Sequence, residues 1–285
     1  MFTSLTVLKG EKMNPTAPMD APAGDLVLYA ANGAVGQVTL NRPASLNSFT
    51  PDMHRNLWSV LDTAEADARI RALVFTGAGR GFHAGADLGS FDFSPGEGLQ
   101  ERANPGPTIE QHFNPTARRL MALRMPTICA VNGVAAGAGA SFAMCCDMVI
   151  AAPSASFVQA FSKIGLVPDA GGSWLLTQRL GLARAMGLAL TGQKLSAAQA
   201  KDFGMIWDVA EDPLAAAMQL AETMAMMPTK AMVATRQLLM GSATRSFDQQ
   251  LDEERDTQAR LGRTHDYMEG VQAFLAKRPA QFKGE

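Results

Sequence analysis

Two stretches of the chain decide its interpretation: AVNGVAAGAGASFAMCCDMVIA at 130–151 and FVQAFSKIGLVPDAGGSW at 157–174. In the first, the small residues 137–141 lie between a predicted strand, Thr127–Val131, and a predicted helix. Small residues let a ligand touch the backbone, and the first turn of a helix leaves N–H groups without partners. This pattern is typical of an oxyanion hole, which binds a developing negative charge. Taken alone, it is more typical of a helix that packs closely on a sheet.

The second stretch contains a candidate acid, Asp169, between Pro168 and Gly171-Gly172. It lies at a predicted helix start among apolar residues. An aspartate in such surroundings has a raised pKa and can move protons between carbon atoms. It can equally cap the helix, a role worth about 1 kcal/mol. The spacing favours neither role over the other.

A second loop of small residues, 80–88, follows the predicted strand Ala72–Thr76. Each of the two loops can supply one backbone N–H donor. Asp87 in this loop is more typical of a helix cap or a structural acceptor than of a catalyst. His83 has three open roles, since a lone histidine can act as acid and base, line a pocket or lie near a ligand phosphate.

The composition excludes several classes of protein. With 47% hydrophobic residues and a net charge of −2, the chain can build a full core and gives no reason to expect nucleic acid or an anionic membrane as partner. We expect neither a membrane-spanning segment nor a secretory signal. Cys129, Cys145 and Cys146 are odd in number and stand in apolar settings, which predicts buried reduced thiols in a cytoplasmic protein and no metal site. Residues 1–24 show no periodicity and predict a flexible leader.

Alternating strands and helices, followed by a helical tail, predict an α/β domain. Asn32-Gly33 predicts a hairpin turn, and Thr50 with Pro51 predicts a helix start. The long Gly- and Pro-rich segment 89–110 predicts a functional loop. The other predicted strands are 26–29, 35–40, 148–151, 157–159 and 205–209, and the other predicted helices are 115–123, 135–146, 171–180, 182–190, 196–203 and those from 213 to about 274.

Five segments in this order resemble the enoyl-CoA hydratase/isomerase (crotonase) superfamily over about Leu26–Phe282. They are 41–47, 81–88, 130–147, 166–172 and 269–278. One of them alone is weak evidence, whereas five in the right order are specific. The resemblance implies a crotonase-like ββα spiral core at 25–212. It also implies a C-terminal helical region at 213–285 that forms a homotrimer or a dimer of trimers.

The resemblance also implies the roles of individual residues. Ala86 and Ala138 would be the two oxyanion N–H donors, and Asp169 would be the acid and base. Phe274 and Lys277 match positions that reach the CoA of a neighbouring subunit. The implied substrate-binding residues are Pro43, Ala44, Ser45, Leu46, His83, Ala84, Asp87, Leu88, Phe161, Trp174, Phe274 and Lys277. No cofactor is implied, because coenzyme A is part of the substrate.

The departures from the family pattern indicate which reaction to expect. Family hydratases add water with two glutamates, whose positions here hold Ser141 and Phe161. Asp169 stands where hydratases usually carry glycine, as in the isomerase branches. Segments such as 160–163 and 204–207 resemble the branch that isomerises the ring epoxide of phenylacetyl-CoA breakdown. We therefore expect an acyl-CoA isomerase, with phenylalanines 82 and 161 and Trp174 either walling the acyl pocket or simply packing in the core.

Three alternatives stay open from the sequence. The first is isomerisation of a 3-enoyl-CoA to a 2-enoyl-CoA, which uses the same groups. The second is a non-catalytic protein that binds acyl-CoA or RNA, although the acidic net charge weakens the RNA role. The third is a hydrolase or dehalogenase in which Asp169 attacks as a nucleophile.

Overall fold

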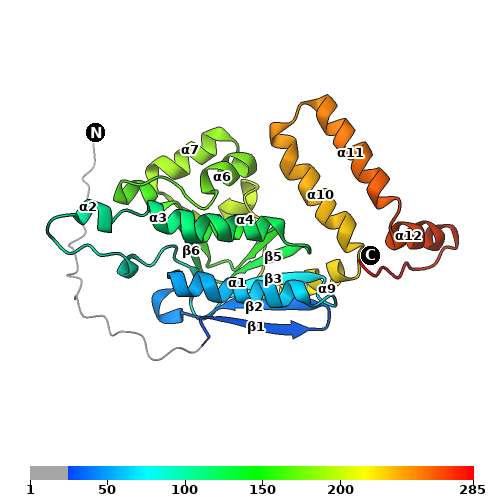
Figure 1. Cartoon of the computed structure of the whole chain (residues 1–285), viewed down its shortest axis with the longest axis horizontal. Helices are drawn as coiled ribbons and strands as arrows, with labels where there is room; N and C mark the ends of the chain where they lie inside the picture. The colour runs from blue at the N-terminus through cyan, green and yellow to red at the C-terminus, as the bar shows by residue number, and fades with distance from the viewer. Residues whose placement is uncertain (1–24) are drawn as a thin grey trace.

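The computed structural model describes residues 25–285, so the predicted leader at 1–24 lies outside the described residues. Two sheets form the centre of the molecule (Figure 1). The larger sheet has the strand order β1 (Val27–Asn32), β2 (Val35–Leu40), β3 (Ala72–Gly77), β5 (Thr127–Val131), β7 (Met148–Ala151) and β10 (Asp208–Val209). The smaller sheet has the order β4 (Gly81–His83), β6 (Val134–Ala136), β8 (Ser156–Val158) and β9 (Lys194–Ser196).

The chain winds as a spiral because successive strands enter different sheets. Strands β3, β5 and β7 pair in parallel in the larger sheet, and β4, β6 and β8, which follow them one by one, pair in parallel in the smaller sheet. Helices connect one pair of strands to the next, as parallel strands require a crossover. The helices of the core are α1 (Pro51–Ala66), α2 (Leu99–Arg102), α3 (Gly106–Thr108), α4 (Asn114–Ala122), α5 (Ala138–Cys145), α6 (Gly172–Leu180), α7 (Leu182–Thr191) and α8 (Ala197–Asp202).

Local sequence signals account for many of these boundaries. The β1–β2 hairpin turns at Gly33, whose φ is 61°. The Thr50 hydroxyl accepts a hydrogen bond from the Met53 N–H at 3.3 Å, so the predicted cap of α1 is confirmed. Ser196 caps α8 together with Gln199. The α/β class predicted from the alternation of elements is confirmed as well.

Some predictions of secondary structure are wrong in extent or type. The segment predicted as a strand at 205–209 contributes only Asp208–Val209 as β10. The helix predicted at 115–123 is preceded by a π-helical turn, Ile109–Phe113. Strands β4, β6 and β9 were not predicted, because three residues are too few for a period of two to be recognised. Residues 89–105 contain only short helical turns, in line with the predicted loop. The end of the predicted loop is wrong, because α3, the π-helical turn and α4 follow one another without a break from residue 106 to residue 122.

Four helices end the chain: α9 (Pro213–Ala225), α10 (Thr229–Gly241), α11 (Phe247–Leu261) and α12 (His265–Leu275). Small side chains of α9 pack on one face of the larger sheet, against a cluster that includes Val74 and Ile128. Helices α10 to α12 extend away from the sheets (Figure 1). The predicted boundary at 212/213 and the predicted trimer stay predictions.

Two further sequence predictions concern burial and membranes. Cys129, Cys145 and Cys146 are all buried and unpaired, as expected. Among the helices of residues 25–285, none has both the length and the hydropathy that crossing a membrane requires.

The start of α5 lies against β4 so closely that only glycine fits between them. A Cβ atom on Gly139 would lie 2.0 Å from the carbonyl oxygen of His83. Backbone atoms cannot yield as the end of a flexible side chain can. We expect Gly139→Ala to lower the free energy of unfolding by about 1–3 kcal/mol or more, measured by urea denaturation.

Gly187→Ala in α7 is the matched control, because an added Cβ there meets nothing within 4 Å. Alanine at this helical position should raise the free energy of unfolding by up to about 1 kcal/mol. Equal shifts in the same direction for both variants would contradict the close approach of α5 to β4.

Candidate active site

A cavity of about 380 Å³ lies where the ends of four segments meet. These segments are the loop after β4, the region from 105 to the π-helical turn, the start of α5, and the stretch from 160 to 169. The lining residues are Ala84, Gly85, Ala86, Leu88, Phe91, Pro105, Thr108, Ile109, Phe113, Ala136, Gly137, Ala138, Ala160, Phe161, Lys163, Ile164, Leu166 and Asp169. The walls are therefore mostly apolar, as is typical of a small-molecule site.

Among residues 84–87 of the loop after β4, one backbone N–H is left without a partner. The N–H of Ala84 donates to Leu46 at 3.0 Å, that of Gly85 to His83 Nδ1 at 3.2 Å, and that of Asp87 to Phe49 at 2.9 Å. Among the described residues, the N–H of Ala86 has no hydrogen-bond partner. Phe49 donates its N–H to the Gly85 carbonyl at 2.8 Å, and in a planar trans peptide the Ala86 N–H then points the opposite way.

A second free N–H comes from the start of α5. Gly137 has φ 54° and ψ −125°, a conformation open only to glycine, and donates its own N–H to Val158 at 2.8 Å. Ala138 is the first residue of the helix, and within the described part of the chain its N–H finds no partner. A Cβ on Gly85 would lie 3.4 Å from the Ala138 nitrogen, so the two loops are neighbours. Both predicted donors therefore line one cavity.

Asp169 adds a carboxyl group to the cavity. Its Oδ1 atom is buried and has no hydrogen-bond partner. Burial raises the pKa of this carboxyl from the usual 3.8 to about 6, and a hydrogen bond to its own backbone opposes the rise. The helix-cap interpretation is wrong, because α6 has Gly171 at its cap position with no side-chain cap bond. Ala170 and Gly171 both have positive φ, which separates Asp169 from the helix start.

Comparison with known proteins identifies the family. The sequence profile described as enoyl-CoA hydratase/isomerase matches residues 30–285. The chain belongs to this family. It is 50% identical to the 1,2-epoxyphenylacetyl-CoA isomerase of Escherichia coli over 263 residues, which cover 92% of this chain and 99% of that protein. It is 35% identical to the 2,3-dehydroadipyl-CoA hydratase of the same organism, over 87% of this chain and 94% of the hydratase.

The fold agrees with solved structures of the family. The crystal structure of an enoyl-CoA hydratase from Polaromonas sp. JS666 superimposes with a TM-score of 0.81 at 32% identity. The match covers 90% of this chain and 99% of that one. The predicted crotonase-like spiral with a helical C-terminal region is thereby confirmed.

Ser141 and Phe161 hold the positions at which family hydratases carry their two glutamates. Ser141 is fully buried on α5, and its hydroxyl oxygen has no partner among the described residues. A Cβ on Gly172 would lie 2.4 Å from that hydroxyl oxygen, so the start of α6 lies close against Ser141. Phe161 lies on the cavity wall beside Gly137. Asp169 is the one carboxylate that lines the cavity as the described residues define it, and Lys163 is its one cation.

Several other predicted site residues do not line the cavity. Asp87 caps the short helical turn Leu88–Ser90 and forms an ion pair of 2.9 Å with Arg42, so its predicted structural role is confirmed. Pro43, Ala44 and Ser45 form a helical turn, followed by Leu46, at the β2–α1 connection. The His83 ring is 1% exposed and lies behind the wall. Contacts of these residues with substrate stay predictions.

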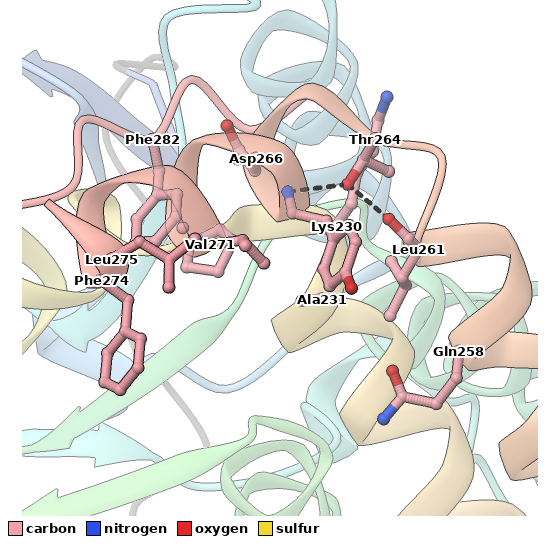
Figure 2. Close-up of a pocket in the computed structure, with 13 residues that line it drawn as sticks. Lys230, Ala231, Gln258, Leu261, Thr264, Asp266, Val271, Phe274, Leu275 and Phe282 are labelled. Atoms are coloured by element: carbon pink, nitrogen blue, oxygen red, sulfur yellow. Dashed lines mark hydrogen bonds between the residues drawn. The ribbon is translucent and has the colours of Figure 1, made fainter.

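The remaining predicted residues, Phe82, Trp174, Phe274 and Lys277, do not line the cavity either. Trp174, 36% exposed, is on α6, and Phe82 is in the core. Phe274 is 82% exposed on α12, and its ring points away from that helix at a second pocket, between α10, α11 and α12 (Figure 2). Lys277 follows α12 and is exposed. The structure of one chain does not bring Trp174, Phe274 or Lys277 into the cavity.

Sequence reasoning missed most of the apolar wall. Phe91, Pro105, Thr108, Ile109 and Phe113 line the cavity. The available signal was the length of the segment 89–110, which was interpreted as functional without any residue being singled out. The π-helical turn that carries Phe113 has no sequence signature, yet such turns are frequent at functional sites.

The raised pKa of Asp169 predicts a pH-dependent effect of Asp169→Asn on stability. A buried acid with a raised pKa stabilises the fold below pH 3.8, and this contribution is lost as the pH rises through about 6. Asparagine lacks this dependence. The free energy of unfolding of the variant relative to wild type should therefore increase between pH 4 and pH 8 by on the order of 3 kcal/mol.

Chemical denaturation at the two pH values measures this difference. Asp208→Asn is a control without this dependence, because hydrogen bonding to Lys201 lowers the pKa of Asp208, so its contribution to stability is lost only as the pH falls below 3.8. The stability of this variant relative to wild type should stay nearly constant between pH 4 and pH 8. A difference between wild type and Asp169→Asn that does not change with pH would show that this carboxyl is solvated.

Proposed function

We propose that this chain is an acyl-CoA isomerase that stabilises an enolate and moves a proton with Asp169. The observation that carries the proposal is the content of one cavity: the unpartnered N–H groups of Ala86 and Ala138, the carboxyl group of Asp169, and no second carboxylate among the described lining residues. A single carboxyl group can remove and return a proton. Adding water by the family's usual route needs two carboxylates.

In this proposal the thioester oxygen accepts hydrogen bonds from the N–H groups of Ala86 and Ala138. Negative charge develops on that oxygen when a proton leaves the neighbouring carbon, and each donor contributes roughly 2.7–4 kcal/mol to its stabilisation. The donors are held by other backbone bonds, so they need no rearrangement during the reaction. The apolar walls exclude water and strengthen both interactions.

Asp169 moves the proton. Its carboxylate takes a proton from C2 of a 3-enoyl-CoA, the electron pair shifts through C3 to C4, and the same carboxyl group returns the proton at C4. The product is the conjugated 2-enoyl isomer, and no atom is gained or lost. A carboxyl group with a pKa of about 6 is suited to both directions of transfer near neutral pH.

For the physiological substrate we propose a ring-epoxide acyl-CoA, 1,2-epoxyphenylacetyl-CoA, which is isomerised to the seven-membered oxepin-CoA. The support is the 50% identity to the Escherichia coli enzyme named for that substrate. Three aromatic rings in the wall, Phe91, Phe113 and Phe161, also provide an apolar space suited to a ring. Asp169 would assist the rearrangement at the ring carbons.

Asp169→Asn is expected to reduce kcat for conversion of a 3-enoyl-CoA to its 2-enoyl isomer by roughly 10²–10⁴-fold, because the amide cannot accept the proton. The wild-type kcat/KM should rise with pH through about 6 and then level off, since the base must be ionised. An absorbance assay of the conjugated thioester measures both quantities. The same pair of proteins is then tested with the ring epoxide.

Asp52→Asn is the matched control, because this aspartate is 74% exposed at the start of α1 and does not line the cavity. Equal turnover by wild type and Asp169→Asn would refute the acid–base role. Hydration of a 2-enoyl-CoA by the wild type would favour the hydratases among the relatives instead. A covalent adduct on Asp169, detected by mass, would favour the hydrolase alternative, and acyl-CoA binding without turnover of either substrate would favour the binding protein.

A further inference from the structure

The buried ring of His83 touches both loops that carry the unpartnered N–H groups. On one side its Nδ1 accepts the Gly85 N–H at 3.2 Å. On the other side lies α5, where a Cβ on Gly139 would come within 2.9 Å of His83 Cγ. The Phe49 ring stacks on the imidazole with 4.1 Å between the ring centroids. His83 therefore fills the space between the two loops.

The peptide groups around Gly85 are held from both sides. The Gly85 N–H is bonded to His83 Nδ1, and the Gly85 carbonyl is bonded to the Phe49 N–H. Since the Gly85 carbonyl and the Ala86 N–H belong to the same planar peptide, rotation of this unit would turn the Ala86 N–H away from the cavity. Gly85 has φ 94°, so the loop has little steric resistance of its own to such a rotation.

We propose that His83 is a positioning residue that directs the Ala86 N–H into the cavity by accepting the Gly85 N–H through Nδ1. This inference rests on the proposed oxyanion hole and deepens it. It replaces the three roles left open by the sequence with one that needs no contact between the imidazole and the substrate.

The neutral form of the ring is the form that can do this. Nδ1 acts as acceptor, so the proton is on Nε2, and the ring's other hydrogen bond is to the backbone of Asn47. Burial lowers the pKa of His83 to about 3, so the ring stays neutral at ordinary pH. A protonated ring would place an N–H at Nδ1 against the N–H of Gly85.

The test compares three variants that keep or remove this acceptor. In His83→Asn the side-chain oxygen can occupy about the place of Nδ1, whereas in His83→Gln the amide reaches about the place of Nε2. His83→Leu fills space without any acceptor. The probe is 4-(dimethylamino)cinnamoyl-CoA, a chromophore whose absorption shifts to longer wavelength when its thioester oxygen accepts hydrogen bonds. Spectra are recorded with saturating full-length protein, and binding is confirmed by titration.

We expect a red shift with wild type, most of it retained in His83→Asn and most of it lost in His83→Gln and His83→Leu. For isomerisation, kcat should fall roughly 10- to 100-fold in the last two with a much smaller change in KM, since loss of a whole oxyanion donor costs about 10²–10³-fold. A role in packing alone would not produce this order. If His83→Leu does not fold, the Asn and Gln variants, which are both polar, still decide the question.

A full red shift in His83→Gln, or an equal loss in the Asn and Gln variants, would overturn the positioning role. A bound probe without any red shift in wild type would overturn the oxyanion hole and this inference with it. A normal red shift in wild type without isomerase turnover would count only against the proposed reaction, because the order of shifts among the variants still tests His83.

Discussion

The close approach of the α5 start to the β4 strand is the constraint on which the site depends. Gly139 permits it, and the glycine-only conformation of Gly137 lets the chain pass from β6 into the helix with a free N–H at Ala138. The loop after β4 then lies beside the helix start, and the unpartnered N–H of Ala86 lies at the same cavity as that of Ala138. The sequence left close packing and oxyanion binding as alternatives. In the structure, close packing at Gly139 and unpartnered N–H groups at Ala86 and Ala138 occur together, so one interpretation does not exclude the other.

The sequence predicted the features that depend on local chemistry. The Asn32-Gly33 hairpin, the Thr50 cap and the buried strands follow from turn preferences, capping and apolar runs, and each is present. The resemblance of the five ordered segments to the family predicted the spiral fold. It also predicted that Ala86, Ala138 and Asp169 share one site, and the three residues line one cavity. Pattern reading found β8 but failed for β4, β6 and β9, the other three-residue strands of the smaller sheet, whose partners come from neighbouring turns of the spiral. It also failed for the π-helical turn and the aromatic wall, where tertiary packing decides the conformation.

Asp169 illustrates why the role of a polar residue is difficult to predict from its neighbours. Its position before two glycines and a helix is that of a cap, but consecutive positive φ values at Ala170 and Gly171 take its side chain out of the reach of the helix. One oxygen of the carboxyl group, Oδ1, is left buried without a hydrogen-bond partner, which is unfavourable for folding and is an arrangement often found in groups that transfer protons. His83 shows the reverse case. Histidine is often catalytic, but the His83 ring is buried and hydrogen-bonded to the backbone. Its proposed role is to position the Ala86 N–H from behind the cavity wall.

The alternation of strands between two sheets has a consequence for how the chain reaches this structure. Neighbours in the larger sheet are distant in the chain, as when Leu73 of β3 pairs with Thr127 of β5. Non-local parallel pairing slows folding, because loop-closure entropy is lost before the contacts form. During synthesis β3 leaves the ribosome well before β5. The edge of β3 that later pairs with β5 therefore stays unpaired while some fifty further residues are synthesised. Such a chain is exposed to aggregation during synthesis, and its yield in cells should depend on chaperones more than its final stability suggests.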